Sequence, residues 1–206
     1  MGTSVEAAYA DRAAEYVEHL GTMASVHPSD VQLVGSWAAS VEGPLLDAGC
    51  GPGHWAGFLA ERGRDVRGID AVPAFVDHAR DRYPSVPFAV GSIDALGDPA
   101  DSHGGVLAWY SLIHHDPEFI RVPLDEFARV LRPGGTLLVG FFVGPSVEAF
   151  DHAVVSAWRW SVEALEQELQ AAGFDVVETH TRIAATGTPR PHGAVLARRR
   201  DPARRG

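Results

Sequence analysis

Residues 45–53 read Leu45-Leu46-Asp47-Ala48-Gly49-Cys50-Gly51-Pro52-Gly53, an apolar strand that runs directly into a glycine-rich turn. Glycine allows the backbone to adopt positive φ and lets a ligand approach without interference from a Cβ atom. A helix that begins after such a turn presents free backbone N–H groups to the ligand at its N-terminus. The stretch therefore predicts a strand, a ligand-binding turn and a helix.

The segments that follow alternate in the same way between short apolar stretches and amphipathic ones. They predict strands at residues 44–48, 65–70, 87–92, 105–110 and 136–143, and helices at residues 55–62, 73–82 and 122–131. Strands that are joined by helices form a parallel sheet with both faces covered. We therefore predict an α/β fold with a doubly wound, mostly parallel sheet.

The C-terminal part follows a different pattern. Ser161 is a typical helix N-cap, and the helix that it begins is predicted to end at residue 172, before Gly173. Residues 174–183 and 194–199 then predict two strands, with no room between them for a crossover helix. Consecutive strands of this kind pair antiparallel, so the sheet is expected to end in an antiparallel hairpin.

The chain has 206 residues, enough for one well-buried α/β core and too few for two ordinary domains. Within this single domain the amphipathic stretches 5–20 and 28–39 predict a helical lead-in. The predicted parts are a lead-in and lid at 1–43, a ligand-binding core at 44–143, a helical insert over the site at 144–160, the last helix and hairpin at 161–199, and a tail at 200–206.

Composition excludes several classes of function. The net charge of −10 argues against a nucleic-acid-binding face, and the arginines near the C-terminus are interpreted as a solvated tail. All basic residues are arginine, so a Schiff-base lysine and a P-loop lysine are both absent. No apolar run is long enough to span a bilayer. The single cysteine, Cys50, fits a reducing compartment, so we expect a cytoplasmic protein.

Two further motifs indicate an adenosine-containing ligand. Asp70 ends the second predicted strand, where its carboxylate can accept hydrogen bonds from both hydroxyls of a ribose. Gly91-Ser92-Ile93-Asp94 ends the third, with an apolar residue suited to packing on adenine and an acid suited to its amino group. Together with the glycine turn, these positions predict an adenosine cofactor.

A dinucleotide is the alternative cofactor, since Gly51-x-Gly53-x-x-Ala56 satisfies the dinucleotide fingerprint. Asp47 argues against it, because a negative charge before the turn suits a cationic amino group and repels a pyrophosphate. The acidic residue of 91–94 and the predicted C-terminal hairpin also differ from the usual dinucleotide-binding sheet.

The same motifs resemble those of the class I S-adenosylmethionine-dependent methyltransferases, in particular small-molecule enzymes. Residues 47–53 are similar to the glycine motif of that family, Gly68-Ile69-Asp70 to its ribose-binding strand end, and residues 91–96 to its adenine-binding turn. Residues 131–138 resemble the turn before its fifth strand, and the resemblance extends in the right order from residue 45 to residue 199. It implies a seven-stranded sheet with an antiparallel C-terminal strand.

The resemblance also implies S-adenosyl-L-methionine as cofactor, S-adenosyl-L-homocysteine as its product, and a methionine moiety near Asp47, Gly49 and Ala108-Trp109. On the first helix, Arg12 shares a face with Tyr9 and Tyr16 and is a candidate partner of the cofactor carboxylate. Cys50 is interpreted as a small buried residue. The predicted cofactor residues are Arg12, Asp47, Gly49, Cys50, Gly51, Gly53, Asp70, Ala71, Ser92, Ile93, Asp94, Ala108 and Trp109.

The predicted binding site for the methyl acceptor is Trp109–Asp116, a segment at the carboxyl end of the fourth predicted strand. An acceptor that must lose a proton needs a base, and histidine is the natural candidate. We expect His114 to be this base, Tyr110 to orient the acceptor, and His115 to be the next candidate. His152, Trp158, Arg159 and Trp160 are candidates for lining the acceptor pocket.

No metal site is expected, because His114, His115 and Asp116 are adjacent in sequence and point apart. Three functions remain open: a methyltransferase for a small-molecule acceptor, an NAD(P)-dependent oxidoreductase, and a non-catalytic protein that binds S-adenosylmethionine. Neither the accepting atom nor the oligomeric state follows from the sequence.

Overall fold

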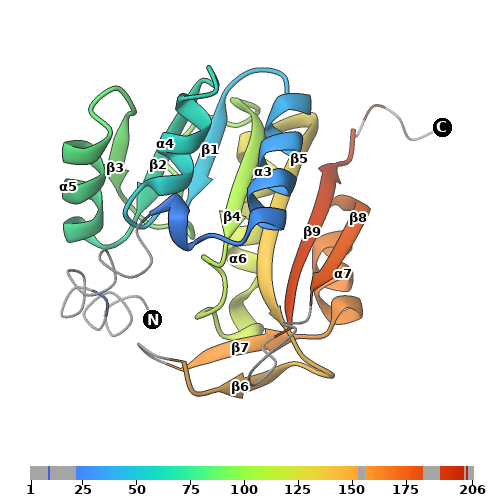
Figure 1. Ribbon diagram of the computed structural model, residues 1–206. Helices are drawn as coiled ribbons and strands as arrows, with labels where there is room; N and C mark the ends of the chain where they lie inside the picture. The colour runs from blue at the N-terminus through green and yellow to red at the C-terminus, as the bar shows by residue number, and fades with distance from the viewer. Residues whose placement is uncertain (1–8, 10–21, 153–155, 183–190, 202, 204–206) are drawn as a thin grey trace.

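The computed structural model describes residue 9 and residues 22–152, 156–182, 191–201 and 203. Its sheet is parallel in the order β3-β2-β1-β4-β5 and continues with antiparallel β9 and then β8 (Figure 1). The strands are β1 (Leu45–Ala48), β2 (Val66–Asp70), β3 (Phe88–Val90), β4 (His103–Trp109), β5 (Leu131–Val143), β8 (Phe174–Arg182) and β9 (His192–Arg199). The predicted fold class is confirmed, including the antiparallel hairpin.

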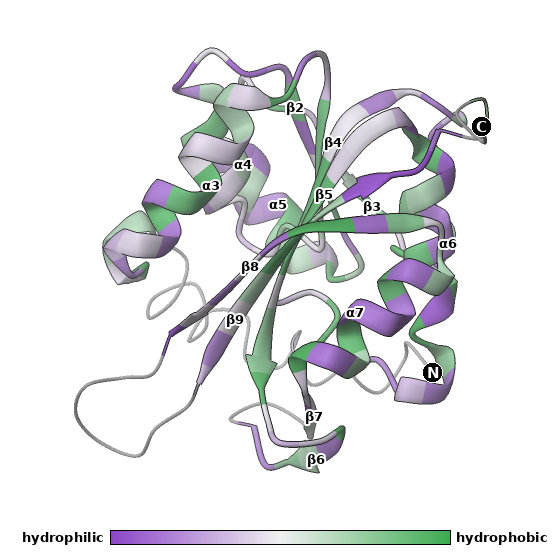
Figure 2. Ribbon diagram, turned by 90° about the vertical axis from the view of Figure 1, so that its right-hand side faces the viewer, coloured by the Kyte–Doolittle hydropathy of each residue, from purple (hydrophilic) through white to green (hydrophobic). Residues whose placement is uncertain are grey.

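Helices cover both faces of the sheet, as Figure 2 shows with the sheet seen edge-on. On one face lie α3 (Pro28–Ser40), α4 (His54–Ala60) and α5 (Pro73–Arg82); on the other lie α6 (Arg121–Val130) and α7 (Val162–Ala171). Two short 3-10 turns, η1 (Met23–Ser25) and η2 (Pro117–Phe119), complete the described helical segments. The predicted stretch 5–20 lies outside the described residues apart from Tyr9.

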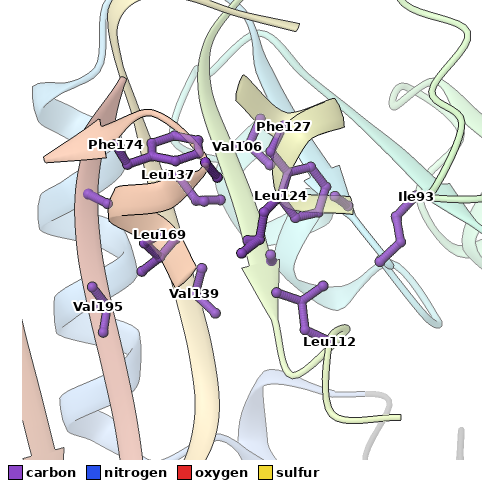
Figure 3. Packing of buried hydrophobic residues seen from close by; sticks show 14 of the residues in the cluster. Ile93, Val106, Leu112, Leu124, Phe127, Leu137, Val139, Leu169, Phe174 and Val195 are labelled. Atoms are coloured by element: carbon purple, nitrogen blue, oxygen red, sulfur yellow. The ribbon is translucent and has the colours of Figure 1, made fainter. Parts of the chain in front are cut away.

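Each face of the sheet has its own apolar core. Leu124 and Phe127 of α6 are fully buried, and Figure 3 shows them beside Val106 of β4. On the opposite face, Trp37 of α3 and Phe58 of α4 pack over the same strands. Burying a large apolar side chain contributes about 1.5–3 kcal/mol, so these two layers hold the carboxyl ends of the strands in fixed relative positions.

Local signals set the ends of the C-terminal helix. The Ser161 side chain accepts a hydrogen bond from the Ala164 N–H at 3.2 Å, and Gly173 follows the helix with φ of 92°. At β5 the prediction was less accurate, because the strand begins at Leu131 and not at residue 136. The residues between these positions form an irregular start, where the register against β4 shifts between His103 and Gly105.

The prediction of a helical insert at residues 144–160 is wrong. The segment contains β6 (Glu148–Phe150) and β7 (Ala157–Trp160), which pair antiparallel with each other. β5 extends beyond the last residue of β4 that pairs with it, and β7 continues the sheet there by pairing parallel with Phe142 and Val143. Aromatic and β-branched residues favour this extended pairing. The hairpin lies at the carboxyl end of the parallel strands (Figure 1).

Candidate active site

A cavity of about 850 Å³ opens at the carboxyl ends of β1, β2 and β4. Cavities of about 300–1,000 Å³ are typical of small-molecule sites. The parallel strands end on this side of the sheet, which is where open α/β sheets bind ligands. Predicted residues that line the cavity are Asp47, Gly49, Cys50, Gly51, Asp70, Ala71, Ser92, Ile93, Asp94, Trp109, Tyr110, His114 and His115.

Two glycines of the turn after β1 have different surroundings. Gly49 has φ of 77°, and a Cβ atom on it would lie 2.3 Å from the Ser111 Cβ atom. Gly51 has φ of 52°, and a Cβ atom there would meet nothing within 4 Å. Gly49 thus lets the turn pack against the segment after β4, whereas Gly51 leaves open space at the cavity wall.

The amides of this turn do not meet the expectation that they are free for a ligand. The N–H groups of Gly49 and Cys50 donate to the Ile69 carbonyl at 2.8 and 2.9 Å. The Gly51 N–H donates to Asp70 Oδ2 at 2.8 Å, and the Gly53 N–H to the Cys50 carbonyl at 3.0 Å. The turn is therefore fastened to the end of β2, and what it offers a ligand is close approach to the backbone.

Asp47 is a carboxylate buried at the end of β1. Its side chain is 2% exposed, and Oδ2 has no hydrogen-bond partner among the described residues. The pKa of this carboxyl is raised from 3.8 to about 7, mainly by burial, against a hydrogen bond from the Ala56 backbone and with a smaller contribution from the nearby charge of Asp70. A buried, unpartnered carboxylate in a cavity wall is a site for a cationic ligand group.

Asp70 and the segment 91–94 form the adjoining wall. Asp70 Oδ1 accepts the Val72 N–H at 2.9 Å, in addition to the bond from the glycine turn to Oδ2. Ile93 is 8% exposed and presents an apolar surface, while Asp94 accepts a hydrogen bond from His115 Nε2 at 2.8 Å.

Of the predicted cofactor residues that the structure describes, Gly53 and Ala108 do not line the cavity. A Cβ atom on Gly53 would lie 2.7 Å from Ala79 Cβ, so this glycine allows α4 and α5 to approach each other. Ala108 is fully buried in the core, and Arg12 lies outside the described residues. Cys50 lines the cavity but is only 3% exposed, and burial raises the pKa of its thiol.

His114 lines the same cavity as the glycine turn. Its Nδ1 is 3.0 Å from the Ser156 carbonyl, which can only accept, so Nδ1 carries the proton of the neutral ring. Nε2 therefore accepts from the Tyr9 hydroxyl at 2.8 Å. Burial lowers the pKa of His114, and the neighbouring His115 lowers it further, against the Ser156 contact. The ring is thus a neutral acceptor near pH 7.

Tyr110 points into the same region from an unusual backbone position. Its φ is 59°, in the left-handed region that favours glycine, and its N–H donates to the Gly140 carbonyl at 3.0 Å. The hydroxyl lies 2.5 Å from His192 Nδ1, and burial raises the phenol pKa. Non-glycine residues held at positive φ are concentrated at functional sites, where the surrounding structure maintains them.

Several lining residues were missed by sequence reasoning. His54 begins α4, and burial lowers its pKa from 6.5 to about 4. Phe142, Arg182 and His192 come from the last three strands of the main sheet. A signal for His192 existed: the last strand runs antiparallel, so its first residue lies where the parallel strands end. His152 lines the cavity as expected, whereas Trp158, Arg159 and Trp160 do not.

The described residues contain neither a metal-binding group nor a membrane-spanning helix. No group of three or more His, Cys, Asp or Glu side chains is placed to hold a metal ion within that part of the chain. Among the helices described, none has the length and apolar character needed to cross a membrane.

Residues 45–135 match the model of a family described as a methyltransferase domain. This range contains the glycine turn, Asp70, the 91–94 wall and His114. The chain thus carries a methyltransferase domain that is similar to the class I S-adenosylmethionine-dependent enzymes. S-adenosylmethionine is the cofactor of those enzymes, so the similarity favours it over the NAD(P) alternative.

Related proteins span several reactions. The chain is 34% identical over 137 residues to a malonyl-[acyl-carrier protein] O-methyltransferase of Salmonella typhimurium, covering 65% of this chain and 51% of that protein. It is 32% identical over 134 residues to the S-adenosyl-L-methionine-dependent Diels-Alderase iccD of Talaromyces variabilis, covering 61% and 45%. The chain thus spans about half the length of these curated relatives.

Solved structures of the family share the fold. The 1,6-didemethyltoxoflavin-N1-methyltransferase of Burkholderia thailandensis, solved with 1,6-didemethyltoxoflavin and S-adenosylhomocysteine, is 20% identical with a TM-score of 0.76. The alignment covers 98% of this chain and 91% of that one. It includes the antiparallel C-terminal hairpin.

Proposed function

We propose that this chain transfers the methyl group of S-adenosylmethionine to a small-molecule acceptor. The observation that carries the proposal is one cavity that is lined both by the glycine turn with Asp70 and by the imidazole of His114. The cofactor motif and a proton acceptor therefore face the same space.

The cofactor end fits S-adenosylmethionine by its own chemistry. Asp47 Oδ2, buried and without a partner among the described residues, suits the amino group of the methionine moiety. Each Asp70 oxygen accepts a backbone N–H, and a carboxylate is the kind of acceptor that suits the ribose hydroxyls. Ile93 is placed to pack on the adenine, with Asp94 beside its amino group. Gly49, Cys50, Gly51, Ala71, Ser92 and Trp109 complete the proposed walls.

S-adenosylmethionine, when bound, supplies an electrophilic methyl group, which leaves its sulfur for the acceptor atom in one in-line displacement and yields S-adenosylhomocysteine. The role of the chain is to hold the acceptor near the methyl group, which can lower the barrier by about 7–11 kcal/mol. His114 Nε2 takes the proton that the acceptor loses, while its Nδ1–H stays bonded to Ser156. For this, the Tyr9 hydroxyl must give up Nε2 to the acceptor.

Two neighbours of His114 have supporting roles. The Tyr110 hydroxyl, beside His192, is placed to orient the acceptor. His115 is the weaker candidate for the base because its Nε2 already donates to Asp94. It is better suited to holding the adenine wall in position.

The experiment is a screen of small-molecule acceptors for formation of S-adenosylhomocysteine, followed by variants on the first active acceptor. His114→Ala should lower kcat about a hundredfold or more, the usual contribution of a general base. His115→Ala is the matched control: it should raise KM for the cofactor and leave kcat nearly unchanged. Equal kcat values for His114→Ala and the parent protein would contradict the role of His114.

A second candidate is a cofactor-binding protein that does not transfer the methyl group. The similarity to a protein named as an S-adenosyl-L-methionine-dependent Diels-Alderase supports this second candidate. In that case S-adenosylmethionine would bind tightly and be recovered unchanged after incubation with every acceptor. Stoichiometric conversion to S-adenosylhomocysteine would exclude this candidate.

A further inference from the structure

A cluster of rings lines the cavity beyond the carboxyl end of β4. The ring centroids of Tyr110 and Phe142 are 5.0 Å apart, those of Tyr110 and His192 5.7 Å, and those of Phe142 and His192 5.5 Å. His152 extends the cluster, with its centroid 6.0 Å from Phe142 and 5.4 Å from His114. We call these four residues, Tyr110, Phe142, His152 and His192, the ring cluster.

Three members of the ring cluster are fixed by the sheet. Phe142 belongs to β5 and is 9% exposed, and His192 is the first residue of β9, which pairs directly with it. Tyr110 is held by its backbone bond to Gly140 and by its hydroxyl contact with His192. Rings that are fixed in this way lose little conformational entropy when a ligand binds.

The charges around the cavity disfavour an anionic acceptor. Among the described lining residues, the acids are Asp30, Asp47, Asp70, Asp94 and Asp116, and Arg182 is the one arginine. Arg182 is already paired, because its guanidinium donates to Asp30 at 2.8 Å. His114 is held neutral by burial, which lowers its pKa. The one arginine of the described wall is therefore already paired, and five carboxyl groups line the same cavity, so a carboxylate or phosphate is disfavoured there.

From this geometry we propose that the ring cluster is the acceptor subsite and that the acceptor is an uncharged, planar aromatic or heteroaromatic molecule with a hydroxyl or ring N–H group. This rests on the function proposed above and specifies its substrate class. Aromatic rings attract other rings beyond simple burial of area, whereas a saturated molecule of equal size gains burial alone. His114, next to His152, places the proton acceptor at the margin of the cluster.

The test measures binding by calorimetry to protein saturated with S-adenosylhomocysteine, so it needs no turnover. Three probes share one carbon skeleton: beta-naphthol, its fully saturated analogue decahydronaphthol, and beta-naphthoate. Aromatic contacts should make beta-naphthol bind about fivefold more tightly than decahydronaphthol. Beta-naphthoate should bind more weakly than beta-naphthol.

Two variants test whether the ring cluster causes the tighter binding of beta-naphthol. Phe142→Leu keeps an apolar side chain and removes one of the four rings, so it should reduce the preference for beta-naphthol over decahydronaphthol while S-adenosylhomocysteine affinity is retained. Phe150→Leu is the matched control: Phe150 packs on Phe142 at 5.3 Å between centroids but does not line the cavity. This control should keep the preference.

Defined outcomes overturn the inference. Equal affinity for beta-naphthol and decahydronaphthol, tighter binding of beta-naphthoate, or an aromatic preference that is unchanged in Phe142→Leu would each contradict it. These results leave the cofactor premise intact, since S-adenosylhomocysteine is bound throughout. Failure of S-adenosylhomocysteine itself to bind would instead contradict the proposed function.

Discussion

The backbone N–H of Gly51 donates to Oδ2 of Asp70 at 2.8 Å, which joins the glycine turn after β1 to the end of β2. The other oxygen of the same carboxylate accepts the Val72 N–H at 2.9 Å. One side chain thus fixes both segments that meet the ribose in our proposal.

Asp70→Asn should therefore weaken cofactor binding in two ways. An amide has one acceptor oxygen, so it cannot keep both backbone bonds and still receive the ribose hydroxyls. Hydrogen bonds to charged groups are each worth about 1.5–3 kcal/mol, so we expect S-adenosylhomocysteine affinity to fall at least about tenfold. Calorimetric titration of the variant measures this. An unchanged Kd would show that Asp70 does not contact the cofactor.

The two glycines of the turn should respond differently to alanine. Gly51→Ala meets no atom within 4 Å and should cost only the positive-φ penalty, about 1–2 kcal/mol. Gly49→Ala carries the same penalty and also places its Cβ 2.3 Å from Ser111 Cβ. Such overpacking costs about 1–3 kcal/mol more. Urea unfolding of both variants compares the two costs. Equal losses would contradict the close packing of Gly49 on Ser111.

Asp47 predicts a pH dependence of stability in the absence of cofactor. Burial raises its pKa from 3.8 to about 7, so between these values the folded state binds the proton more tightly than the unfolded chain. This contribution to stability is present at low pH and is lost as pH rises through about 7, at a cost on the order of 4 kcal/mol. Asp47→Asn should remove this cost and raise the Tm of the ligand-free protein at pH 8.

The same variant should bind the cofactor less well, because the charge that faces the amino group is gone. S-adenosylhomocysteine affinity of the parent protein should increase as pH rises through about 7 and Asp47 ionises. Asp47→Asn should lose that dependence. A variant that is both less stable and unchanged in affinity would refute the assignment of Asp47 to the amino group.

The lowered pKa of His114 predicts how kcat/KM declines at acid pH. Burial lowers its pKa below the usual 6.5, so Nε2 stays unprotonated and able to accept a proton at pH 6.5. With an acceptor that loses a proton, kcat/KM should decline only below that value. Measuring kcat/KM against pH checks this. A midpoint above 6.5 would indicate that His114 is charged when the acceptor binds.

That the glycine turn, Asp70 and Ser92-Ile93-Asp94 line one cavity could be predicted from sequence because each part is local. The glycine turn and Ser92-Ile93-Asp94 follow the ends of strands, Asp70 is the last residue of one, and parallel strands bring their carboxyl ends together. The bonding of the turn amides could not be predicted, since it depends on the register that places Ile69 and Asp70 beside the turn.

The acceptor side depends on contacts between distant segments, which local patterns do not reveal. Tyr110 meets His192 from a position 82 residues away in sequence. The β6–β7 hairpin forms because β5 continues beyond β4 and offers an unpaired edge, and this is a property of the assembled sheet. The prediction of a helix at 144–160 failed for that reason.

The central claim is that Asp47 and Asp70 flank a pocket for S-adenosylmethionine and not for a dinucleotide. Calorimetry with S-adenosylhomocysteine and, separately, with NADH tests it most directly. We predict saturable heat with a micromolar Kd for S-adenosylhomocysteine and none for NADH. A clean NADH titration together with no heat from S-adenosylhomocysteine would contradict it.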